Sequence, residues 1–283
     1  MYFYSILIFW LIIGFFGAYS QAVFSMDQDP TEGFRSSRSF ISSQKVLLPD
    51  LDYVSVDEQF NHFFEVLNTK IEASQDNLAT LVFLHREALD LVSKYRKKGS
   101  QIALSQKPIL QHTLALRLHD LPQEDPLVSR INSLRECCLL LKASYTAEYL
   151  PAKMSYAMAL FETAILIDQL LEEDQNLTPL QQSHLQQEII SSLELSRKLL
   201  PPETETQSGI HIGLHNLLGL TLFKYAFFHR DELTDAVIRR YSLRARKVLT
   251  EAYNFHHDEM SFDTLETTLE SVNKFLGAKY GII

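Results

Sequence analysis

The sequence contains few residues that interrupt helices and lacks the short motifs of two common enzyme classes. Only nine glycines and nine prolines occur among 283 residues, which argues against a loop-rich β fold. There is no glycine-rich phosphate loop and no Gly-x-Ser-x-Gly motif. The sequence therefore gives no support for a P-loop nucleotide hydrolase or for a serine hydrolase of the α/β type.

Cysteine is also scarce. The only two cysteines, Cys137 and Cys138, are adjacent within an apolar run. Neighbouring residues of a helix point about 100° apart, so these two thiols are badly placed to bridge each other. The sequence thus excludes an intramolecular disulfide framework. We predict that both cysteines are small hydrophobic core residues.

Positive charge is in the minority. Twenty-six Lys and Arg residues face 35 Asp and Glu residues, which gives a formal net charge of −9. This balance offers no electrostatic reason to expect nucleic-acid binding. Two local basic runs, 94–98 and 239–247, are interpreted as solvated helix faces or charges at helix C-termini, with a phosphate- or acid-binding patch as the alternative. The composition as a whole, 46% hydrophobic and 22% charged, is that of an ordinary globular protein.

The first 20 residues contain an uncharged apolar run from Tyr2 to Tyr19. Ala18 and Ser20 fit the small-residue positions of a signal peptidase site, so we predict a signal peptide cleaved after Ser20 and a protein of the secretory pathway, secreted or lumenal. No basic residue precedes the run, which leaves the alternative of a retained membrane anchor with a cytosolic body. Residues 21–52 form a polar linker.

The remaining chain is periodic with the spacing of helices, and the fold class predicted is all-α. Residues 53–121 are predicted to form a helical-hairpin region. Within it, a turn at Ser74–Asn77 would split residues 56–98 into an antiparallel pair of helices, and an extended coiled coil is the alternative. Pro108 is expected to open the next helix. Residues 122–283 form a domain that resembles a helical repeat. The helices expected after residue 100 are 109–121, 127–149, 152–172, 180–200, 210–229, 232–254 and 262–279.

A spacing of four and then three residues recurs in the second half of the chain. It places small, large and small apolar residues on one helical face in two triplets: Ala157, Phe161 and Ala164, and Ala245, Leu249 and Ala252. Such faces let helices approach closely, as in the second helix of a tetratricopeptide repeat. We therefore predict an irregular, tetratricopeptide-like array or bundle of helical hairpins behind the N-terminal hydrophobic segment.

Three features together carry a resemblance to a known family. The Leu218-Gly219 pair, the stretch 245–252 and the following His257 make residues 127–283 similar to the helical C-terminal region of SET-and-MYND-type lysine methyltransferases. That region shapes substrate and partner binding, so the resemblance implies an interaction role. Two cysteines cannot build the zinc clusters of that family, and no SET-type core is found. The resemblance therefore implies no catalysis.

The densest apolar patch after the N-terminus lies in the segment 223–228. We predict that Phe223, Tyr225, Phe227 and Phe228 bind a protein or peptide partner, with core packing as the alternative. The function predicted is that of a non-catalytic interaction or scaffold protein without cofactor, catalytic residue or metal. The oligomeric state is left open.

The alternative function is that of an enzyme of the secretory route or a metal-dependent helical bundle. His211 and His215 lie four residues apart and, with His256 and His257, would supply imidazole ligands. Ile212 stands where a zinc peptidase requires Glu, so that motif fails. We expect these to be surface or interface histidines.

Overall fold

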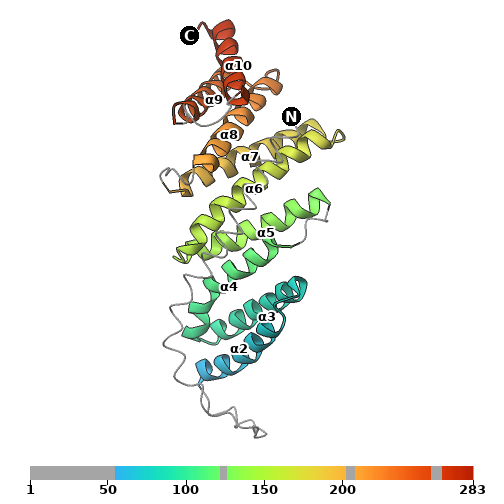
Figure 1. The fold of residues 1–283 in the computed structure, drawn as a ribbon, viewed down its shortest axis with the longest axis vertical. Helices are drawn as coiled ribbons and strands as arrows, with labels where there is room; N and C mark the ends of the chain where they lie inside the picture. Colours follow the sequence, from blue (N-terminus) through green and yellow to red (C-terminus); the bar gives the residue numbers. More distant parts are fainter. Residues whose placement is uncertain (1–54, 122–125, 202–207, 256–262, 283) are drawn as a thin grey trace. The chain divides into compact units, whose positions relative to one another are not determined.

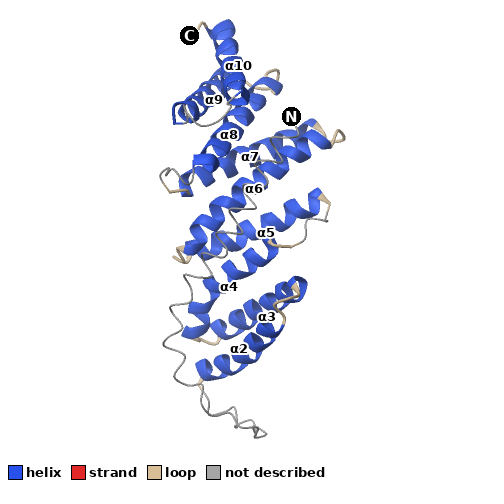
Figure 2. Ribbon diagram, viewed as in Figure 1, coloured by secondary structure: helices blue, strands red, loops and turns tan. Residues whose placement is uncertain are grey.

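The computed structural model describes residues 55–121, 126–201, 208–255 and 263–282. Every regular element in these ranges is an α helix (Figure 2), which confirms the all-α prediction. The helices are α2 (Val56–Ala73), α3 (Leu78–Lys97), α4 (Gln101–His119), α5 (Leu127–Thr146), α6 (Pro151–Glu173), α7 (Pro179–Leu199), α8 (Ser208–Phe228), α9 (Asp235–Phe255) and α10 (Asp263–Tyr280). The expected signal peptide or anchor, the polar linker and the pair His256-His257 lie outside the described residues.

A turn separates α2 from α3, as the antiparallel alternative for residues 56–98 requires. Ser55 begins α2 with a capping box, in which its hydroxyl accepts a hydrogen bond from the Glu58 amide. Asn77 begins α3 by accepting from the Thr80 amide at 3.0 Å. The pair is therefore an antiparallel helical hairpin and not an extended coiled coil.

The expectation that Pro108 opens a helix is wrong. Helix α4 begins seven residues earlier, at Gln101, and contains Pro108 in its interior. Ser100 caps α4 by accepting from the Ala103 amide at 3.0 Å. A proline inside a helix removes one backbone hydrogen bond and costs about 3 kcal/mol, so the cap and the burial of Ala103 and Leu110 on either side hold the helix together. The Pro108 carbonyl also accepts a hydrogen bond from the Ser144 hydroxyl of α5 at 2.7 Å.

Each helix packs against the next one along the chain, and Figure 1 shows the consecutive helices side by side. Helices two apart also touch, in the pairs α2–α4, α4–α6 and α8–α10. One compact unit, 54–283, spans both helical regions expected from the sequence. The array of adjacent helical hairpins predicted from the sequence is thus confirmed.

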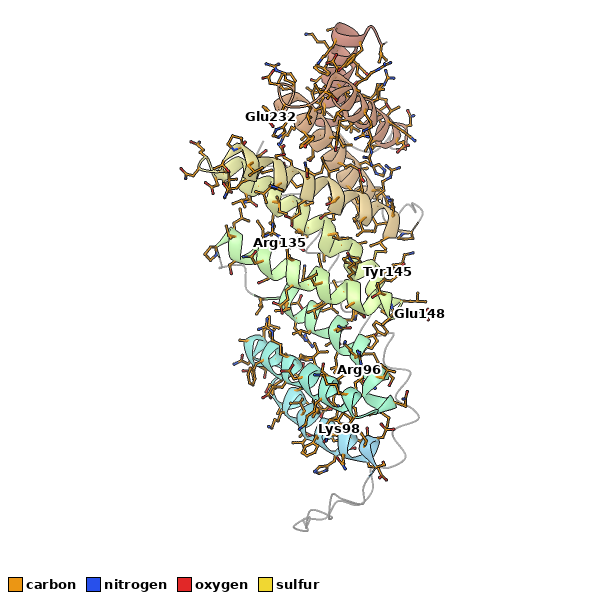
Figure 3. The ribbon with its side chains drawn as sticks, turned by 180° about the vertical axis from the view of Figure 1, so that it is seen from behind. Arg96, Lys98, Arg135, Tyr145, Glu148 and Glu232 are labelled. Atoms are coloured by element: carbon orange, nitrogen blue, oxygen red, sulfur yellow. The ribbon has the colours of Figure 1, made fainter. Side chains whose placement is uncertain are left out.

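Ion pairs connect helices that are two positions apart along the chain. Arg86 of α3 binds Glu136 of α5 at 2.9 Å, and these residues are 50 positions apart. Arg135 of α5 forms a two-pronged pair with Glu188 of α7 at 2.7 Å, 53 positions away. Arg135 is labelled in Figure 3. One hairpin therefore spans about 50 residues in this array, more than the 34 of a tetratricopeptide unit.

The two predicted triplets of small and large residues are buried as expected. Ala157, Phe161 and Ala164 of α6 lie in the core, and so do all three residues of the α9 triplet. The Ser196 hydroxyl of α7 donates to the Ala157 carbonyl at 2.7 Å, so α6 and α7 approach closely. Phe161 also fills the space beside Gly213 of α8, where an added Cβ atom would lie 3.3 Å from the ring.

Helix α6 is long and apolar and lies in the middle of the described array. Among the described residues, it is the one helix whose length and composition would allow it to cross a membrane. In the structure, however, 67% of its apolar window is buried against other parts of the chain. Its hydrophobicity is accounted for by its contacts with α5 and α7.

Candidate functional site

The predicted partner-binding residues lie in the last two turns of α8, and the helix divides them between two sides. Tyr225 is buried, and its ring lies 5.1 Å from the ring of Tyr241 in α9. Its hydroxyl accepts a hydrogen bond from the Gln187 amide group of α7 at 2.8 Å. Residues two apart on a helix point in nearly opposite directions. Tyr225 therefore belongs to the core between α7, α8 and α9.

The three phenylalanines of this segment lie together. Phe223 and Phe227 are four residues apart and share a face, with ring centroids 6.1 Å apart. Phe228 meets Phe227 edge-on at 5.8 Å. The exposed fraction is 39% for Phe227 and 67% for Phe228. Two large rings thus meet water next to each other at the end of α8.

Helix α10 contributes two further rings that the sequence analysis did not single out. Phe275 contacts Phe223 at 5.7 Å and Phe227 at 6.2 Å between ring centroids. Tyr280 lies 6.3 Å from Phe275. These separations are those of favourable edge-to-face ring pairs. We call Phe223, Phe227, Phe228, Phe275 and Tyr280 the aromatic cluster.

Cations lie over the rings of the aromatic cluster. The Arg230 guanidinium lies 5.1 Å from the centroid of Phe227. The Lys279 ammonium lies 5.9 Å from the centroid of Phe275 and 5.5 Å from that of Tyr280. A cation over an aromatic face stabilises an exposed site by about 0.5–1 kcal/mol. The cluster is therefore a surface with both apolar and cationic groups.

The start of α9 joins this surface. The Tyr280 hydroxyl donates to the Asp235 carbonyl at 3.3 Å, and the Arg239 guanidinium lies 5.9 Å from the Tyr280 ring. The Lys279 ammonium forms an ion pair with the Asp235 carboxylate at 2.8 Å. The hydrogen bond to Asp235 raises the pKa of Lys279 above its usual value, so this side chain stays charged. The end of α8, the start of α9 and the end of α10 therefore meet at the aromatic cluster.

The histidines proposed as alternative metal ligands are placed otherwise than expected. His211 and His215 are buried rather than on the surface, and their rings stack with centroids 6.2 Å apart. The His215 Nδ1 donates to the His211 carbonyl at 2.6 Å. Burial lowers the pKa of His215, which favours the neutral ring. Within the described ranges, no three His, Cys, Asp or Glu side chains are grouped as metal ligands.

A buried charged group connects α4, α5 and α6. The Glu162 carboxylate accepts from His119 Nε2 at 2.7 Å and from Arg130 Nη2 at 2.8 Å. Burial disfavours a charged imidazolium, but hydrogen bonds to Asp120 and Glu162 and the charges of both carboxylates outweigh it. They raise the pKa of His119 to about 9. Each charge is satisfied by another side chain, so this group is a structural connection between three helices.

The cysteine pair lies between the same helices. Cys137 is buried and donates its Sγ–H to the Ala115 carbonyl at 3.2 Å, while Cys138 is half-buried beside Thr163. Burial raises the pKa of Cys138 to about 11, and it also raises the pKa of Cys137. Both thiols are therefore protonated at neutral pH and lack the thiolate that a nucleophile requires.

Comparisons of the chain with protein-family models, with curated proteins and with solved structures found no match. The resemblance to the helical region of SET-and-MYND-type methyltransferases therefore stays a prediction. Among the side-chain groups described above, the aromatic cluster is the one that combines exposed large rings with charged groups at its edge.

Proposed function

We propose that this chain is a non-catalytic interaction protein and that the aromatic cluster binds a protein or peptide partner. The exposure of Phe227 and Phe228 carries the proposal, since 39% and 67% of these two neighbouring rings remain in water. Burying a side chain of this size is worth roughly 1.5–3 kcal/mol. A partner that covers both rings would gain much of that free energy.

The composition of the surface supports a protein partner. The cores of protein interfaces are enriched in aromatic residues and arginine. Phe223 and Phe275 lie beside Phe227 and support its ring from two helices. A ring that is already held in place loses little conformational entropy when a partner binds.

The fold supports the same role. Arrays of helical hairpins present extended surfaces on a frame whose neighbouring units brace one another. The resemblance to the SET-and-MYND helical region likewise implies partner binding without catalysis. The apolar run 2–19 supports an interaction in the secretory pathway, or at a membrane if that segment is retained.

Two matched variants test this function. The first changes Phe227 and Phe228 to Ala, and the second changes Leu139 and Leu180, which are both 69% exposed and lie on α5 and α7. Complexes of the tagged full chain are stabilised by mild cross-linking in cells and compared by quantitative mass spectrometry. We expect the first variant to lose specific partners that the second retains. Equal partner sets for wild type and both variants would contradict the proposal.

A further inference from the structure

Three arginines, one just after α8 and two in the first turns of α9, share an arrangement, and two of them lie over rings of the aromatic cluster. Each guanidinium lies over an aromatic ring, with its Cζ between 5.1 and 5.9 Å from the ring centroid. The pairs are Arg230 with Phe227, Arg239 with Tyr280, and Arg240 with Tyr241. We call Arg230, Arg239 and Arg240 the stacked arginines. All three are exposed.

The stacked arginines differ from the arginines that connect helices. Arg86, Arg135, Arg197 and Arg244 each form an ion pair with a glutamate of another helix. Across the described part of the chain, no carboxylate lies within ion-pair distance of a stacked arginine.

The chemistry of a stacked guanidinium suggests what would bind it. A ring over one face of the guanidinium holds its plane and leaves the N–H edges free to point away from the ring. Those edges match the two oxygens of a carboxylate or a phosphate, which accept paired hydrogen bonds. Arg239 and Arg240 also lie in α9, where five basic residues occur with only two acidic ones. The surface therefore favours an anionic ligand.

Acidic residues at the same place limit the kind of anion. Asp231 and Glu232 follow Arg230 directly and are exposed; Glu232 is labelled in Figure 3. Asp235 forms the ion pair with Lys279 at 2.8 Å. These carboxylates would repel a continuous phosphate backbone or an anionic membrane surface. A peptide is able to place single carboxylates against the arginines and keep them away from these acidic residues.

We infer that the partner binds through a peptide segment in which acidic residues alternate with large apolar ones. Its carboxylates bind the edges of the stacked arginines, and its apolar side chains cover Phe227 and Phe228. The inference rests on the proposed function, because it specifies the partner of the same surface. Charge complementarity between the stacked arginines and the peptide supplies specificity and speeds association.

Fluorescence anisotropy with two labelled peptides tests the inference on the purified full chain. One short peptide alternates Asp or Glu with Leu or Phe, and the other carries Lys in place of every acidic residue. The test variant changes the three stacked arginines to Gln. The control variant changes Lys70 of α2 and Arg96 and Lys97 of α3 to Gln, because these side chains are also exposed and their replacement removes the same amount of charge. Circular dichroism confirms that both variants fold.

We expect the acidic peptide to bind saturably and the basic peptide not to bind. Loss of the stacked arginines should lower the affinity for the acidic peptide by about tenfold or more, since several charged contacts disappear together. The control variant should stay within about twofold of wild type, because exposed charges away from a contact contribute little. If the triple variant misfolds, the single Arg239→Gln and Arg240→Gln variants replace it.

Three results would overturn the inference. The first is that the acidic peptide shows no saturable binding, and the second is an equal loss of affinity in the test and control variants. The third is that phosphatidylserine vesicles or an oligonucleotide bind more tightly than the acidic peptide, and that this binding is lost in the test variant. Partners lost specifically with Phe227 and Phe228, together with no peptide binding, would leave the proposed function standing and refute only this inference. Failure of both experiments would refute both.

Discussion

The Leu249 side chain of α9 occupies the space that a Cβ atom at Gly219 of α8 would require. A Cβ built on Gly219 would lie 2.6 Å from Cδ2 of Leu249, well inside the contact distance of two carbon atoms. Gly219 therefore lets α8 and α9 approach closely, and Leu249 fixes their separation. This contact joins the Leu-Gly pair and the small–large–small triplet, two features that the sequence alone singled out.

Gly219→Ala should destabilise the protein, although alanine favours helix by about 1 kcal/mol. Overpacking a core contact typically costs about 1–3 kcal/mol, and here the added methyl meets a rigidly packed side chain. Gly277→Ala in α10 is the matched control, because its Cβ would meet nothing closer than 3.8 Å. Chemical denaturation should show that Gly219→Ala lowers and Gly277→Ala leaves or raises the free energy of unfolding.

The double variant Gly219→Ala with Leu249→Ala separates crowding from other effects. Once Leu249 is truncated, the alanine at position 219 should no longer be harmful, so the two effects should not add. Additive losses in the double-mutant cycle would show that Leu249 does not set the spacing of α8 and α9.

The buried pair of His119 and Glu162 predicts a loss of stability at alkaline pH. The pKa of His119 rises from an ordinary 6.5 to about 9 in the folded protein. Its contribution is therefore complete below pH 6.5 and disappears as the pH rises through 9. Urea denaturation between pH 6 and pH 10 should show a decrease on the order of 3 kcal/mol.

His119→Gln is the control for this pH effect. Glutamine is able to donate to Glu162 but does not titrate, so the alkaline decrease attributed to His119 should vanish. The pKa of Glu162 is lowered, because hydrogen bonds and charges from His119 and Arg130 outweigh the opposing effect of burial. Its contribution is lost only at acid pH. An unchanged alkaline decrease in His119→Gln would assign the effect to another group.

The purified protein should contain no stoichiometric zinc. His211 and His215 are buried and their rings stack on each other, so replacing both with Ala should lower the melting temperature by removing packed volume. Metal content measured by mass spectrometry should stay at background in wild type and variant alike. Stoichiometric zinc that is lost with these two histidines would favour the alternative metal-dependent function, with His256 and His257 as the remaining ligands.

The mature chain should begin at Gln21. The apolar run 2–19 is too hydrophobic to remain in water, and Ala18 and Ser20 fit the specificity of a signal peptidase. N-terminal sequencing of the protein from cells that express the full chain measures this directly. An intact Met1 and a pellet that resists carbonate extraction would establish a membrane anchor in its place.

Much of the fold was readable from local signals. Helix starts follow from side-chain caps such as Asn77, and close helix contacts follow from the spacing of Ala157, Phe161 and Ala164. Pro108 does not open the helix, because the Ser100 cap eight residues upstream outweighs the preference of proline for a first turn. Ion pairs such as Arg86 with Glu136, 50 positions apart, have no local signature and require the folded chain.

The candidate site was only half readable. Phe223, Phe227 and Phe228 lie in the aromatic cluster as a group, but Tyr225 does not, and the helical period of 3.6 residues would have separated it. Phe275 and Tyr280 join the cluster from α10, about 50 residues further along the chain, and no pattern near residue 223 points to them. Tertiary packing alone brings these rings together.

A photo-crosslinking residue placed at position 228 tests the central claim most directly. The same residue placed at Leu139, which is 69% exposed against 67% for Phe228, is the matched control. Irradiation of cells that express each full-length variant should give a discrete covalent adduct with another protein from position 228 and none from position 139. Adducts of equal yield from both positions, or none from position 228, would contradict a partner-binding role for the aromatic cluster.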